Sequence, residues 1–135
     1  MLWEEKTPVY GDVVRTRIRF YYHYGIYVSD HQVIQFGLPD NRGIPNEEIR
    51  VLSTDIYSVL CGGTLEVGTA EKEERRSLRT PGEIVSRAES RLGEAGYNIL
   101  HNNCEHFVYD CAFGQAKAGW LEEARMKLRQ KLGKE

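Results

Sequence analysis

The stretch YNILHNNCEHF, residues 97–107, decides the fold. It is typical of a short strand, a polar turn and the first turn of a helix. Asn103 is a good N-cap, because its side-chain oxygen can accept hydrogen bonds from the free N–H groups of that turn. Cys104 then takes the first helical position, where the positive end of the helix dipole favours a thiolate. From this stretch alone, Cys104 is equally well interpreted as a nucleophile or as a small apolar core residue.

Two amphipathic helices are predicted around this stretch. The first begins at a capping box, residues 80–83, with proline at its first position. The second begins at Cys104 itself. Helical spacing predicts the buried face of each: Ile84, Val85, Ala88 and Leu92 in the first, and Phe107, Val108, Cys111 and Ala112 in the second.

A hairpin is predicted upstream, because residues 20–28 and 32–36 are rich in aromatic and β-branched side chains. A two-residue turn would pair Ile26 with Gln35 and send His23 to the opposite face. A three-residue turn over residues 29–31 would pair Gly25 with Gln35 and place His23 diagonally beside it. If His23 and Gln35 act together, the turn must therefore have an odd length.

The remaining segments predict an α+β fold, with an antiparallel sheet packed against helices. Further strands are expected near residues 13–20, 48–52 and 64–68, with a loop at 37–46 between them. A short helix is expected at residues 55–60, capped by Ser53 or Thr54, and Cys61 after it is interpreted as a packing residue. Arg15, Arg17 and Arg19 alternate along one strand, which favours a solvated face over contact with phosphate headgroups.

Composition limits the class of protein. The chain has 135 residues, enough for one core, and its net charge of −2 argues against nucleic-acid binding. Three cysteines are too few for a disulfide scaffold, and the acidic start resembles no signal peptide, so a cytoplasmic location is expected. Residues 1–115 are predicted to form the catalytic domain. Residues 116–135 are predicted to form a basic amphipathic helix that either touches anionic lipid peripherally or docks on its own domain.

His23 is the candidate base for Cys104, and Gln35 is the candidate orienting group. The carbonyl oxygen of Gln35 can accept from one ring N–H of His23, which leaves the other ring nitrogen for the sulfur. His31, His101 and His106 compete for the base role, although His106 should point away from the sulfur. A metal site at Cys104 and His106 has no second ligand pair with suitable spacing, so neither a metal nor a cofactor is expected.

Four motifs in this order resemble the lecithin:retinol acyltransferase-like domain, a circularly permuted member of the NlpC-type papain-like superfamily. They are Gly11-Asp12, the His23-x-Gly-Ile-Tyr-Val strand, residues 88–98 and the Asn-Asn-Cys104-Glu-His-Phe run, and the resemblance covers residues 9–114. It implies that Cys104 is the nucleophile, that His23 is the general base and that Gln35 is the third polar residue, where lipid-acting animal members usually carry histidine. It also implies that Glu105 and His106 support the helix start.

The expected function is thiol-dependent transfer or hydrolysis of an acyl group through a thioester, with a lipid or other small acyl compound as substrate. Phospholipid is a candidate substrate. One alternative is a cysteine peptidase or amidase of the same superfamily, which would use the same three residues but a polar groove in place of an apolar channel. Another is a non-catalytic lipid-binding or protein-binding module, for which an ordinary thiol pKa would be expected.

Overall fold

The computed structural model describes residues 1–19, 21–41 and 43–114. The predicted domain boundary at residue 115 and the predicted basic helix at 116–135 lie outside the described residues. Within them, no helix is both long enough and apolar enough to cross a membrane.

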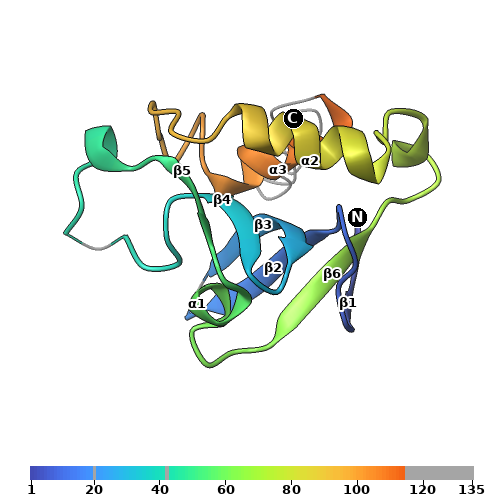
Figure 1. The fold of residues 1–135 in the computed structure, drawn as a ribbon, viewed down its shortest axis with the longest axis horizontal. Coiled ribbons are helices and arrows are strands. Elements are labelled where there is room, and N and C mark those ends of the chain that lie inside the picture. The colour runs from blue at the N-terminus through green and yellow to red at the C-terminus, as the bar shows by residue number, and fades with distance from the viewer. Residues whose placement is uncertain (20, 42, 115–135) are drawn as a thin grey trace, which may run out of the picture.

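The described residues form one antiparallel sheet with helices packed against it, which confirms the predicted α+β class (Figure 1). The permuted papain-like topology stays a prediction. The strands lie in the order β1-β6-β2-β3-β4-β5, and their bounds are β1 Leu2–Glu5, β2 Val13–Ile18, β3 Tyr21–Ser29, β4 Gln32–Phe36, β5 Val51–Thr54 and β6 Leu65–Thr69. The helices are α1 Ile56–Leu60, α2 Pro81–Ser90 and α3 Cys104–Phe113, with single 3₁₀ turns η1 Asn46–Glu48 and η2 Glu74–Arg76.

Helices α2 and α3 lie together over the sheet, and α1 lies at its other side (Figure 1). The main core fills the space between the sheet and the two longer helices, and it includes Phe36, Phe107 and Val108, all fully buried. A smaller core joins Val59 of α1 to Val14 and Val33 and to their neighbours. The contact of α3 with β3 is what brings the late helix to the early hairpin.

The β3–β4 hairpin has the predicted register but not the predicted turn. Ile26 pairs with Ile34 and Ser29 pairs with Gln32, so only two residues form the turn. Val28 is an extra residue in β3, and this bulge shifts the register as an odd-length turn would. Continuing the register sets Gly25 opposite Gln35. A side chain at Gly25 would force Val33 to shift, because a Cβ there would lie 2.9 Å from Val33 Cγ1.

Three other local predictions were wrong. The strand expected at 48–52 begins three residues later, because residues 46–48 form η1. Cys61 is exposed and has a φ of 48°, so it ends α1 in the left-handed region and does not pack in the core. Leu92 is 42% exposed, because it follows the end of α2.

Further differences concern edges and ends. Strand β1 was not predicted, the strand expected at the start of residues 97–107 is only an isolated bridge between Asn98 and Asn102, and Asp55 caps α1 in place of Ser53 or Thr54. The row of arginines is not uniform either. Arg15 lies 2.7 Å from Glu66 and between the rings of Trp3 and Tyr22, so it holds neighbouring strands together.

Candidate active site

The start of α3 is fixed by reciprocal hydrogen bonds, of which the sequence predicted the N-cap at Asn103. Asn103 Oδ1 accepts from the N–H groups of Glu105 and His106, at 2.9 and 3.1 Å. His106 Nδ1 accepts from the Asn103 N–H at 3.1 Å and completes the capping box. This bond occupies Nδ1 of His106, which therefore supports the helix and does not face Cys104. Hydrogen bonds in both directions between Asn103 and the first turn therefore fix Cys104 at the first helical position.

His23 and Gln35 are in contact, as the hairpin register required. Their Nε2 and Oε1 atoms lie 2.6 Å apart, and both side chains are buried. Gln35 Oε1 can only accept, so the neutral imidazole carries its proton on Nε2 and leaves the Nδ1 lone pair available. Gln35 Nε2 in turn donates to Thr54 Oγ1 at 2.7 Å. The sequence predicted Thr54 only as a possible helix cap, because nothing in the local pattern relates β5 to His23.

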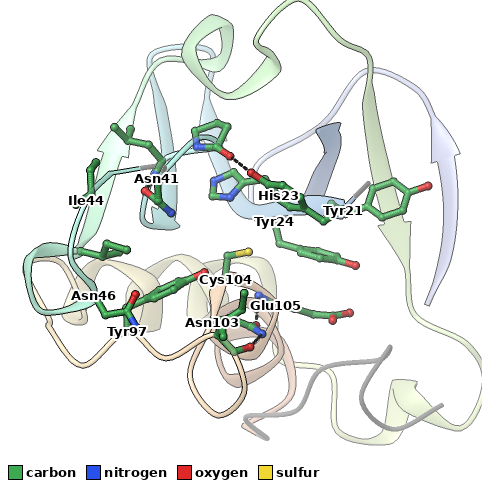
Figure 2. A pocket seen from close by; sticks show the side chains of 15 residues that line it. Tyr21, His23, Tyr24, Asn41, Ile44, Asn46, Tyr97, Asn103, Cys104 and Glu105 are labelled. Atoms are coloured by element: carbon green, nitrogen blue, oxygen red, sulfur yellow. Dashed lines mark hydrogen bonds between the residues drawn. The ribbon is translucent and has the colours of Figure 1, made fainter. Parts of the chain in front are cut away.

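His23 and Cys104 line the same cavity, of about 760 Å³. In Figure 2 the sulfur of Cys104 points from the start of α3 toward the part of the wall that holds His23. The other three histidines do not line this cavity, and His31 and His101 are exposed. Much of the remaining wall is apolar or aromatic: Tyr21, Leu38, Pro39, Ile44, Ile49, Tyr97 and Ile99 contribute to it. A candidate nucleophile and a candidate base thus share an apolar pocket.

Burial sets the protonation state of both groups. It lowers the pKa of His23 to about 4, although the hydrogen bond that His23 donates to Gln35 opposes the shift. It raises the pKa of Cys104 to about 11, and the charge of Glu105 adds to the rise, while backbone N–H groups of Tyr24 and of the helix start oppose it. The helix start therefore favours the thiolate less than burial disfavours it. At neutral pH both groups are therefore uncharged, a thiol and a neutral imidazole on the wall of one cavity.

Comparison with known proteins agrees with the motifs. The family model for lecithin retinol acyltransferase matches residues 6–117. The chain is 31% identical to lecithin retinol acyltransferase of Mus musculus over 83% of its length, and 30% identical to that of Bos taurus over 84%. It spans 57% and 58% of those two proteins, a little over half their length. It is also 28% identical to phospholipase A and acyltransferase 3 of Homo sapiens, covering 86% of this chain and 77% of that protein.

Proposed function

Because the chain belongs to the lecithin retinol acyltransferase family, we propose that it takes an acyl group from an ester onto Cys104 and passes it to water or another acceptor. The names of the relatives above support an activity of the acyltransferase or phospholipase type for this chain. The observation that carries the cysteine mechanism is the shared pocket: a helix-start thiol and a glutamine-oriented imidazole line one cavity.

The proposed reaction has two halves. His23 Nδ1 takes the proton of Cys104 as the sulfur attacks the ester carbonyl carbon, and a tetrahedral oxyanion forms. The C–O bond then breaks, the leaving alkoxide receives the proton from His23, and a thioester remains on Cys104. In the second half, water or an acceptor alcohol or amine gives a proton to His23 and attacks the thioester carbon. The C–S bond then breaks, and the Cys104 thiolate takes the proton back from His23.

The backbone N–H of Cys104 is the donor that we propose for the oxyanion. The Asn103 side chain takes up the next two N–H groups, of Glu105 and His106, but not that of Cys104. A backbone donor at this place needs no rearrangement when negative charge develops.

The apolar wall of the cavity favours a fatty acyl chain over a peptide. Leu38, Ile44 and Ile49 can contact methylene groups and offer a peptide backbone few hydrogen bonds. We therefore propose a phospholipid as the acyl donor, and a peptidase or amidase remains the competing proposal. The neutral Gln35 supports the imidazolium less than a charged group would, but it keeps the ring oriented.

Intact-mass analysis tests this proposal directly. The protein is incubated with phosphatidylcholine vesicles that carry only oleoyl chains, and separately with a peptide amide. We expect one oleoyl adduct with the vesicles, its loss in Cys104→Ala, and its retention in Cys61→Ala, since Cys61 is exposed and absent from the cavity wall. An adduct that persists in Cys104→Ala contradicts the assignment of the nucleophile. Modification or cleavage with the peptide amide alone favours the competing proposal.

A further inference from the structure

We propose that Thr54 is a positioning residue for the acyl-transfer site, acting through Gln35 to hold the proton of His23 on Nε2. This inference rests on the function proposed above and names a residue from a third strand. Neither the motifs nor the residues expected from the sequence include it in the site.

The three side chains form a diagonal row across β3, β4 and β5. Gln35 pairs with Leu52, so Thr54, two residues further on, is its diagonal neighbour on the same face. His23 is the diagonal neighbour on the other side, because Gly25 is opposite Gln35. The distances agree with this placement: 2.6 Å between His23 and Gln35, and 2.7 Å between Gln35 and Thr54.

The hydrogen bonds along this row all run in one donor-to-acceptor direction, and the contact at Thr54, the end opposite His23, sets that direction. Thr54 Oγ1 lies 3.1 Å from the backbone oxygen of Asp55, which can only accept, so the hydroxyl proton points there. The lone pairs of Thr54 Oγ1 then accept from the amide of Gln35, whose oxygen is left for His23. Each group thus donates away from the cavity, and the free imidazole lone pair is the one on Nδ1.

The opposite orientation of Gln35 would disable the base. With the amide turned over, its NH₂ group would donate to His23 Nε2 and the proton would move to Nδ1. The ring nitrogen that remains for Cys104 would then be a donor and could not take the proton of the thiol. Gln35 is fully buried, so no bulk water competes to hold the amide, and Thr54 is the partner that distinguishes the two orientations.

Thr54→Val tests the proposal, because valine keeps the shape and removes the acceptor. The ¹⁵N shifts of labelled histidine report the tautomer of His23, and acyl-transfer kinetics are measured on the same samples. We expect the Nε2–H form in the wild type, a substantial population of the Nδ1–H form in Thr54→Val, and a fall of about tenfold in kcat with little change in KM. Thr54→Ser should restore both readouts. An unchanged tautomer together with an unchanged kcat in Thr54→Val would overturn the proposal.

A double-mutant cycle separates positioning from a loss of stability. Gln35→Glu keeps an acceptor for His23 but has no amide to orient, so adding Thr54→Val to it should change kcat by less than about twofold. The same tenfold loss in both backgrounds would contradict a path through Gln35. The tautomer can be read without turnover, so an inactive wild type would refute the proposed function and leave the test of Thr54 intact.

Discussion

At the scale of single residues, burial disfavours the charged forms of Cys104 and His23. Each is more stable uncharged, so in the proposed mechanism the charges that form on proton transfer have to be stabilised by the substrate and by backbone dipoles. The hydrogen bond that His23 donates to Gln35 stabilises the protonated imidazole. The thiolate is therefore expected to form during the attack and not in the resting protein.

The pH dependence of kcat/KM should reflect this neutral pair. In the proposed mechanism the free enzyme is competent when His23 is unprotonated and the thiol is protonated, between pKa values of about 4 and about 11. We expect kcat/KM to fall on the acid side near pH 4, well below the ordinary histidine value of about 6.5, and to stay level through neutral pH. An acid limb at 6.5 or higher, measured with a substrate that does not titrate in this range, would contradict the neutral pair.

At the scale of elements, α2 and α3 both begin with a capping box. Thr80 and Glu83 form a capping box at α2, and Asn103 and His106 form one at α3. Only the second lies next to the candidate nucleophile, so the two caps offer a matched comparison.

Asn103→Ala and Thr80→Ala should lose similar stability but differ in thiol chemistry. Each removes an N-cap, which costs about 1 kcal/mol of unfolding free energy by chemical denaturation. Asn103→Ala should also change the rate of Cys104 alkylation by iodoacetamide, measured by peptide mapping, because the first turn of α3 is released. Thr80→Ala should leave that rate unaltered. Equal alkylation rates in both variants would show that the cap does not position Cys104.

At the scale of the whole molecule, burying His23 makes folding sensitive to acid. The pKa of His23 is about 4 in the folded chain and about 6.5 in an unfolded one. Between these values the unfolded chain binds more protons, so the free energy of unfolding falls as the pH falls through this window. The difference amounts to about 3 kcal/mol once the pH is below both values.

Replacing the histidine should remove this part of the acid sensitivity. Urea denaturation at pH 7 and pH 4.5 is compared for the wild type, His23→Gln and His31→Gln. We expect His23→Gln to lose about 2 to 3 kcal/mol less than the wild type on acidification. His31 is exposed in the hairpin turn, so its variant should behave as the wild type does. If both variants retain the full acid loss, His23 is not the group responsible.

Local features of this protein could be predicted from the sequence because local forces produce them. The caps of α2 and α3 depend on side chains within three residues of the helix start, and the buried face of α3 follows from helical spacing. The pairing of His23 with Gln35 was also accessible, since a hairpin register is confined to a few alternatives by its turn. Even there the predicted register was right but the predicted turn length was wrong, because a bulge at Val28 shifts the register in place of a longer turn.

What the sequence by itself determined is therefore the identity of the helices, the hairpin and the contact of His23 with Gln35. The catalytic roles of Cys104, His23 and Gln35 stay predictions. Only the tertiary structure decided that Cys104 and His23 share a cavity, that Thr54 approaches Gln35 from β5, and that burial outweighs the helix dipole in setting the thiol pKa. The physical reason is that these outcomes depend on strand order and on desolvation, which arise from contacts between segments far apart in the chain. No local spacing of residues encodes them.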